Sequence, residues 1–193
     1  MNVKHKDISR IINMKLILVQ HGETFDSMLY FTPLTEKGFD QSNKLVEKLS
    51  SYDIDAIYSS PFLSTLQTIY PYCQANNKTV KVENTFYECL TSPVFNHKNY
   101  RHRPAELQKS WPHLGLIVER YQSKVFVSNI NYMETHQDVL NRVFPFIHNL
   151  KKEDKTVLII THRIIINAIK KYFDSSVSME DDIGKATPFI IDL

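Results

Sequence analysis

The sequence predicts an α/β fold with three layers, in which a mostly parallel central sheet carries helices on both faces. The first observation is the alternation of short apolar runs with helical patterns along most of the 193 residues. The second is that two of these runs, Leu16–Val19 and Val157–Ile160, are aliphatic enough for strands buried on both faces. Each run is followed within two residues by a histidine, at the strand end where ligands of such sheets bind.

The first half of the chain alternates strands and helices after the first of these runs. Thr35 is expected to cap a helix that ends near Ser50. A second strand is predicted at residues 55–58. Pro61 has its φ angle already set for a helix start, so the next helix is expected at about residues 62–74.

The second half begins with a short β-branched strand, expected at residues 79–82. From residue 83 to about residue 133 the pattern loosens, with scattered prolines and short helical pieces. This composition indicates a segment (83–133) that covers the ligand edge of the sheet. A long helix is expected from Glu134, with Pro145 kinking or breaking it, and a further helix at residues 164–173 follows the second buried strand.

A chain of this length has room for one ordinary domain. We expect that domain at residues 14–193, preceded by an N-terminal extension of residues 1–13. The extension lacks the apolar region of a secretory signal, and no apolar run approaches the ~20 residues of a membrane helix. The predicted location is therefore cytoplasmic. The net charge of +2 gives no reason to expect nucleic acid or a membrane as a partner.

The metal-binding residue types do not occur in a ligand pattern. Cys73 and Cys89 are too few for a disulfide framework and lack metal-ligand spacing, so they are expected to be buried free thiols. No two of the eight histidines are spaced as ligands on one helix or turn, which disfavours a metal hydrolase. We predict no metal and no other cofactor.

The two histidines at strand ends are the main functional signal. If the two buried strands are neighbours, His21 and His162 lie at the same edge of the sheet. One imidazole can then attack a phosphorus atom while the other binds the phosphoryl oxygens, assisted by the N-terminus of the helix after His162. Gly22 has no Cβ, which lets the backbone approach a ligand closely.

Five short motifs occur in a fixed order along the chain. They are Gln20-His21-Gly22-Glu23-Thr24, Pro33–Gly38 followed by Gln41, Ile57–Thr68, Phe86–Cys89, and Thr161-His162-Arg163. In this order they resemble the motifs of the histidine phosphatase superfamily, which contains phosphoglycerate mutases and many phosphomonoesterases. The resemblance covers most of the chain from Met14 onward and implies a phosphoglycerate mutase-like fold.

The resemblance also implies a role for three side chains. His21 would be the nucleophile that becomes a phosphohistidine, and Glu88 the general acid that later acts as a base. His162 would be an electrostatic partner of the phosphoryl group. The implied partner is a small phosphorylated molecule or a phosphoprotein, and no oligomeric state is predicted.

The chain departs from the family at the phosphate clamp. The family has two arginines where this chain has Gln20 and Ser64, and commonly an asparagine where it has Ser27. Amide and hydroxyl groups still donate hydrogen bonds but bring no charge. Losing two cationic donors costs on the order of 10⁴–10⁶ in rate if the effects add. The candidate substrate-binding residues are Gln20, Gly22, Thr24, Ser27, Ser64, Arg101, Arg103 and Arg163.

Three arginines are candidates to replace the lost clamp. Arg101 and Arg103 lie in the covering segment, and Arg163 stands where the family has a glycine, so it either supplies charge or blocks entry. Arg142 is expected to pair with Asp138 on the long helix instead. Two interpretations stay open: a phosphomonoester hydrolase of weak or altered activity, and an inactive relative that serves as a binding or interaction module.

Overall fold

Five strands form one sheet in the order β3-β2-β4-β1-β5. The computed structural model describes residues 14–25, 30–89, 107, 109–126, 133–153 and 155–193. The strands are β1 (Lys15–Gln20), β2 (Ala56–Ser59), β3 (Lys81–Val82), β4 (Thr156–Thr161) and β5 (Pro188–Asp192). The α-helices α1 (Glu36–Lys48), α2 (Leu63–Asn76), α4 (His136–Leu150) and α5 (Arg163–Phe173) and the 3-10 helices η1 (Asn84–Phe86) and η2 (Pro112–Leu116) surround them.

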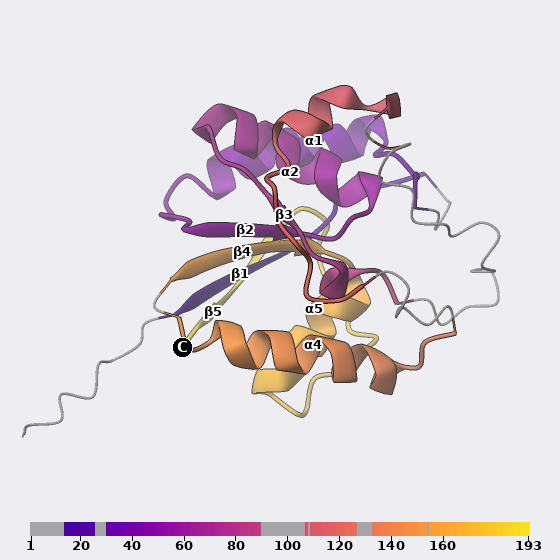
Figure 1. Cartoon of the computed structure of the whole chain (residues 1–193), viewed down its shortest axis with the longest axis vertical. Helices are drawn as coiled ribbons and strands as arrows, with labels where there is room; N and C mark the ends of the chain where they lie inside the picture. Colours follow the sequence, from indigo (N-terminus) through magenta and orange to yellow (C-terminus); the bar gives the residue numbers. More distant parts are fainter. Residues whose placement is uncertain (1–13, 26–29, 90–106, 108, 127–132, 154) are drawn as a thin grey trace, which may run out of the picture.

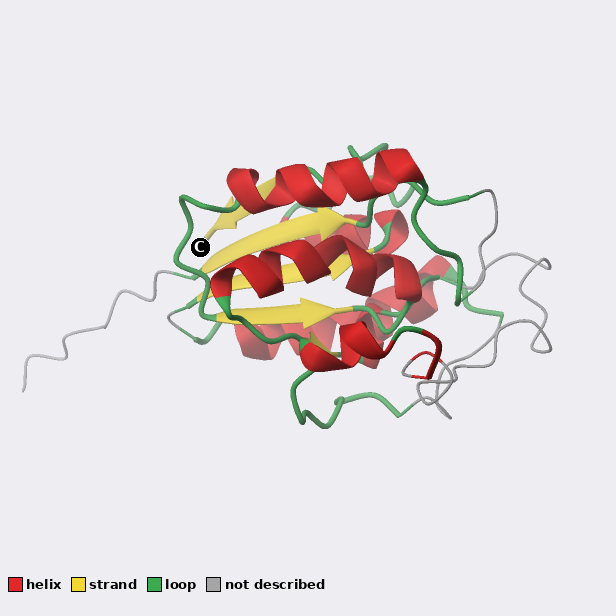
Figure 2. Ribbon diagram, turned by 90° about the horizontal axis from the view of Figure 1, so that it is seen from above, coloured by secondary structure: helices red, strands yellow, loops and turns green. Residues whose placement is uncertain are grey.

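The helices form two layers, one on each face of the sheet. Helices α1 and α2 cover one face, and α4 and α5 cover the other (Figures 1 and 2). Strands β1, β2, β3 and β4 are parallel, and only β5 among the described strands runs antiparallel, against β1. The predicted α/β fold with a mostly parallel central sheet is therefore confirmed.

The two central strands carry apolar side chains on both faces. In β1, Ile17 and Val19 pack into the cluster beneath α1 and α2, whereas Leu16 and Leu18 pack into the cluster beneath α4 and α5. All four side chains are fully buried. This two-sided burial explains why the strand is a continuous apolar run instead of an alternating one.

The start of α2 and the effect of Pro145 on α4 differ from what the sequence predicts. Helix α2 begins at Leu63 with Phe62 as its N-cap, so Pro61 precedes the helix and does not occupy its first turn. Pro145 lies inside α4 and does not break it. Proline has no backbone N–H, so the carbonyl of Asn141, four residues earlier, lacks its usual helical donor. Because both residues lie on the exposed side of α4, water can bind this carbonyl instead.

Strand β5 was not expected from the sequence. It pairs antiparallel with β1 from Lys15↔Asp192 to Val19↔Pro188. Its residues are half-buried or exposed and begin with a proline, so the apolar signal is weak. The strand brings the segment before it, residues 183–187, alongside the end of β1.

The covering segment is described in part. Val80 forms a bridge with Val118, which continues the sheet edge next to β3. The fully buried carboxylate of Glu83 accepts hydrogen bonds from Ser123 Oγ (2.7 Å) and the Tyr121 hydroxyl (2.7 Å). It also accepts from the backbone N–H groups of residues 85 and 124 (2.9 and 3.0 Å), so one carboxylate fastens this segment to η1. Within the described ranges, no helix is long and apolar enough to cross a membrane.

Candidate active site

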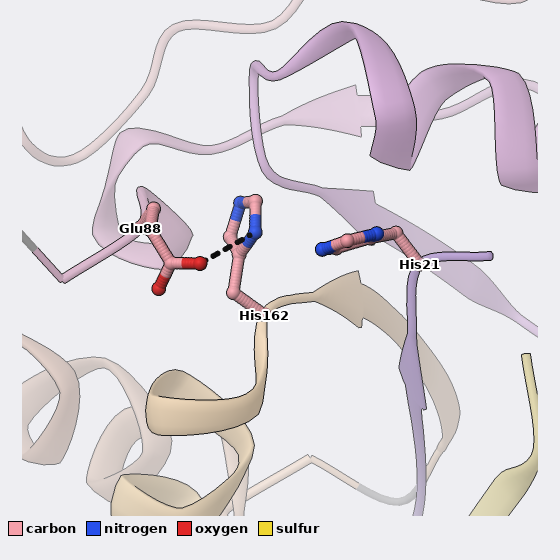
Figure 3. A group of neighbouring side chains, drawn as sticks. All are labelled: His21, Glu88 and His162. Carbon is pink, nitrogen blue, oxygen red and sulfur yellow. Dashed lines mark ion pairs between the residues drawn. The ribbon is translucent and has the colours of Figure 1, made fainter. Parts of the chain in front are cut away.

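Two histidines lie side by side where β1 and β4 end. The two strands are neighbours in register, with Gln20 opposite Thr161, so the residues that follow them meet at one edge of the sheet. The ring centroids of His21 and His162 are 5.1 Å apart. Figure 3 shows the His21 ring extending from the end of β1 toward His162, with Glu88 on the far side of His162. The expectation that both imidazoles share one site is met.

His21 is held as a neutral imidazole with one free nitrogen. Its Nδ1 lies 2.8 Å from the Gly22 carbonyl oxygen, which can only accept, so Nδ1 carries the hydrogen. The lone pair is then on Nε2. The pKa of His21 is lowered to about 3, mainly by burial and additionally by the charges of His162 and Lys185. His21 is therefore uncharged at neutral pH, as a nucleophile must be.

His162 is fixed by a hydrogen-bond partner on each ring nitrogen. Its Nδ1 lies 3.1 Å from Glu88 Oε2, and its Nε2 lies 2.8 Å from Ser60 Oγ. The ring also packs edge-on against Phe62, with centroids 4.7 Å apart. Only 2% of His162 is exposed, so the imidazole has one defined orientation beside His21.

Glu88 follows η1 and keeps 22% of its side chain exposed. Burial opposes charge on this carboxyl, but the positive charge of His162 and the hydrogen bonds from His162 and the Cys89 N–H outweigh it, so the pKa of Glu88 is lowered. Without a bound anion, Glu88 is therefore ionised at neutral pH and paired with His162.

Arg142 holds the backbone that carries Glu88. Its guanidinium donates to the carbonyl oxygens of Thr85 and Tyr87, the latter at 2.8 Å. Its ion-pair partner is Glu134, bound through two hydrogen bonds of 2.7 and 2.9 Å. The expected pair with Asp138 is wrong, because that carboxylate accepts from Thr135 in the capping box of α4.

The glycine after the nucleophile serves packing between elements. A Cβ on Gly22 would lie 2.7 Å from the carbonyl oxygen of Gly38, so only glycine allows the turn after β1 to rest on α1. The Gly22 N–H donates to Thr68 Oγ1 (2.9 Å) and is thus already engaged. Thr24 is half-buried and forms a bridge with Leu34 next to this contact.

The two positions that lack arginine are both buried. Gln20 has its amide nitrogen 2.8 Å from the Ile183 carbonyl oxygen and its amide oxygen 2.9 Å from Lys185 Nζ, in the orientation that satisfies both ends. Ser64 lies in the first turn of α2, where its carbonyl accepts from Thr68 Oγ1 (2.7 Å). The Gln20 amide thus faces the segment before β5.

The candidate replacement arginines lie elsewhere or outside the described residues. Arg163 donates to the backbone carbonyl of Glu180 (2.7 Å) and to its carboxylate (2.9 Å), and no contact with the two histidines or Glu88 is present among the described residues. Arg101, Arg103 and Ser27 lie outside the described part of the chain.

Two residues of the site were not assigned by sequence reasoning. Ser60 lies within the motif Ile57–Thr68, so a motif-based argument could have assigned its contact with His162. Lys185 had no such signal, because nothing in its neighbourhood forms a pattern and its place depends on the unexpected strand β5.

The cluster of His21, Glu88 and His162 also has the residue types of a metal site. One ligand atom from each lies within 4.8 Å of the others. Both ring nitrogens of His162 are already engaged, one of them by the Glu88 carboxylate. A metal ion would have to break this ion pair, so the arrangement favours proton transfer over metal binding.

The family of the chain follows from comparison with known proteins. The family model described as histidine phosphatase superfamily (branch 1) matches residues 16–181. The chain belongs to this superfamily. The match spans both strand ends and Glu88, so the cluster in Figure 3 lies inside the part of the chain that defines membership.

Individual members of the superfamily resemble this chain over most of its length. Phosphoserine phosphatase 1 of Hydrogenobacter thermophilus is 27% identical over an alignment of 168 residues, and the match covers 81% of this chain and 74% of the relative. The structure of Bacillus stearothermophilus YhfR superposes with a TM-score of 0.66 and 22% identity, over 92% of this chain and 90% of the other. A phosphoglycerate mutase from Bacillus anthracis gives a TM-score of 0.65 and 17% identity, over 94% and 88%. These two structures support the fold.

Proposed function

We propose that this histidine phosphatase superfamily member hydrolyses phosphomonoesters through a phosphohistidine on His21. The main support for the proposal is that the His21 ring is neutral and has its hydrogen on Nδ1. Its Nδ1–H is bound to a backbone carbonyl and its pKa is about 3, which leaves Nε2 with a free lone pair at every physiological pH.

In the first step, His21 Nε2 attacks the phosphorus of the substrate. A P–N bond forms and the P–O bond to the leaving alcohol breaks. The leaving oxygen takes a proton from Glu88, so the alcohol departs neutral. The Nδ1–H of His21 keeps its bond to the Gly22 carbonyl, which fixes the ring during the transfer.

The proton on Glu88 is supplied when the substrate binds. Glu88 is ionised while it is paired with His162 alone. A phosphoryl dianion beside this pair adds negative charge, which raises the pKa of Glu88 and favours its protonated form. The protonated Glu88 keeps its 3.1 Å contact with His162 Nδ1.

In the second step, water replaces the histidine. Glu88, now a carboxylate, accepts a proton from the water while the water oxygen attacks phosphorus. The P–N bond breaks, its electron pair returns to His21 Nε2, and inorganic phosphate leaves. The site is restored with neutral His21 and a proton on the Glu88–His162 pair.

The turnover is expected to be low. The positions of the family's two arginines hold the neutral residues Gln20 and Ser64, and the Gln20 amide nitrogen is bound to the Ile183 carbonyl. The second candidate function, an inactive binding or interaction module, is favoured by this same observation. The two differ in whether His21 becomes phosphorylated.

The substrate class is a phosphomonoester on a small molecule or a protein. Because one relative is named a phosphoserine phosphatase, phosphoserine is a rational first substrate to test beside p-nitrophenyl phosphate. A cytoplasmic location stays a prediction of the sequence and is checked by cell fractionation.

The test compares the protein with His21→Ala and with His148→Ala as the matched control. His148 is an exposed histidine on α4 whose ring contacts Tyr172. Hydrolysis that is lost in His21→Ala and kept in His148→Ala supports the proposal. Equal hydrolysis in all three proteins shows a contaminating phosphatase and removes the support, and phosphate binding without His21-dependent hydrolysis favours the binding module.

A further inference from the structure

Lys185 is held at the nucleophile by the backbone of the segment before β5. It forms a bridge with Gln20, the residue directly before His21, and the N–H of Ala186 donates to the Gln20 carbonyl (2.9 Å). Ala186 has a φ angle of 43°, a left-handed conformation that is unfavourable for a residue with a Cβ. Lys48 Nζ donates to the Ala186 carbonyl (3.0 Å), so contacts from two other elements maintain this conformation.

The ammonium group of Lys185 is partly removed from water, and its hydrogen-bond partner in the described part of the chain is a neutral amide. Its Nζ lies 2.9 Å from the Gln20 amide oxygen. Within the described ranges it forms no ion pair with a carboxylate, although the site contains Glu88. A half-buried cation without a partner is costly unless an anion joins it. An ammonium also has three donors, of which Gln20 takes one.

We propose that Lys185 binds the phosphoryl group of the substrate in place of the arginine that the family carries at position 20. The inference rests on the proposed function, since it assigns a phosphate-binding residue to that same site. The two free donors of Lys185 would face phosphoryl oxygens on the His21 side of the pocket.

The presence of glutamine instead of the family's arginine at position 20 is consistent with Lys185 supplying the positive charge. An arginine there would place a second cation against the ammonium of Lys185, whereas the Gln20 amide offers an oxygen at 2.9 Å. Gln20 is then a positioning residue: its amide nitrogen holds the Ile183 carbonyl and its oxygen orients Lys185. The charge of Lys185 also contributes to the low pKa of His21, which places the cation within electrostatic reach of the nucleophile.

The test uses the full chain and two readouts, orthovanadate affinity and His21-dependent hydrolysis of p-nitrophenyl phosphate. The variants are Lys185→Met, Lys185→Arg and Lys185→Met combined with Gln20→Arg. The matched control is Lys155→Met, which removes a half-exposed lysine that pairs with Glu153 at the end of β4 opposite His162. Thermal unfolding of each variant verifies that it is folded, and Lys185→Gln replaces Lys185→Met if that variant is not.

Lys185→Met is expected to weaken orthovanadate binding about 10- to 100-fold, the effect of losing a charged hydrogen-bond donor. Lys185→Arg should keep the affinity, the added Gln20→Arg should restore it, and Lys155→Met should change it less than about threefold. Unchanged affinity in Lys185→Met, or an equal loss in Lys155→Met, overturns the inference.

The two readouts separate this inference from the proposed function. Hydrolysis that depends on His21 but not on Lys185, with unchanged orthovanadate affinity, refutes the inference and leaves the function standing. A protein without His21-dependent hydrolysis that still loses orthovanadate affinity in Lys185→Met refutes the function and supports Lys185 as the anion-binding residue.

Discussion

Glu88 Oε2 lies 3.1 Å from His162 Nδ1, which links the end of η1 to the end of β4 beside His21. Glu88 is the only carboxylate of the described cluster and the proposed donor to the leaving group. The proposed proton transfer from Glu88 can be tested with two substrates, one whose leaving group must be protonated and one whose leaving group need not be.

Glu88→Gln removes the proposed proton donor and leaves the shape of the side chain. General acid catalysis contributes about 10²–10⁴ in rate, so hydrolysis of an alkyl phosphate such as phosphoserine should fall by that factor. p-Nitrophenyl phosphate should lose less, since nitrophenolate leaves without a proton. The control is Glu180→Gln, whose carboxylate pairs with Arg163 away from the cluster. An equal loss on both substrates would indicate that Glu88 only maintains the structure.

Glu83→Gln should destabilise the protein at neutral pH. The carboxylate accepts hydrogen bonds from Ser123, Tyr121 and two backbone N–H groups, and an amide would turn its NH₂ toward these donors. We expect the free energy of unfolding to fall by about 1–3 kcal/mol. Denaturant unfolding measures this, with the half-exposed Glu119→Gln as a control expected to change stability by less than about 0.5 kcal/mol.

The Glu83 effect should also depend on pH. Burial opposes charge on Glu83, but its hydrogen bonds outweigh burial and hold its pKa below the ordinary value. A carboxyl with a depressed pKa contributes stability above its unfolded pKa and loses it as the pH falls through its folded pKa. The stability difference between the protein and Glu83→Gln should therefore shrink on acidification below about pH 4.3. A constant difference from neutral to acid pH would contradict this account.

Phosphate affinity should fall at alkaline pH. Burial is the main cause that lowers the pKa of Lys185, and Arg163 lowers it as well. The acidic groups that oppose this shift are Glu88, Glu23 and Asp182. Lys185 loses its charge as the pH rises through its folded pKa, which lies below the ordinary lysine pKa of about 10.4. The affinity for inorganic phosphate should therefore begin to fall before the pH has risen to that ordinary value. Titration calorimetry of Lys185→Arg should show no such fall, and a fall of equal size there would assign it to another group.

Metal removal should leave the reaction unchanged. The cluster that could hold an ion already pairs Glu88 with His162, and the proposed steps use only protons and the His21 lone pair. Dialysis against a chelator should thus preserve His21-dependent hydrolysis. Loss of hydrolysis on dialysis and its recovery with Zn²⁺ would show that the cluster binds a catalytic metal instead.

The sequence predicted where His21 and His162 lie, because local signals determine the position of both residues. Leu16–Val19 and Val157–Ile160 are apolar on both faces, so they had to be central strands, and central strands of one sheet bring their ends together. The order of the motifs then selected Glu88 among many carboxylates. Thr35 was also predictable as a cap, because its side chain accepts from the N–H of Gly38.

The sequence could not predict the surroundings of Gln20. Whether its amide faces the substrate or the protein depends on the segment before β5, which joins the site only through tertiary pairing with β1. Lys185 is an isolated lysine in the segment before β5, and lysines are usually solvated. Arg163 looked like the better candidate for a clamp, but its partner Glu180 lies 17 residues further along and no local pattern joins them.

The most direct test of the account is the detection of phosphate on His21. The protein is mixed with an excess of p-nitrophenyl phosphate, quenched in alkali, which preserves phosphohistidine, and digested for mass spectrometry. The account predicts one added phosphoryl group on the peptide that contains His21, lost when His21 is replaced by alanine and kept when His148 is replaced. Hydrolysis that proceeds at the same rate without any phosphorylated His21, or a phosphoryl group on another residue, would contradict it.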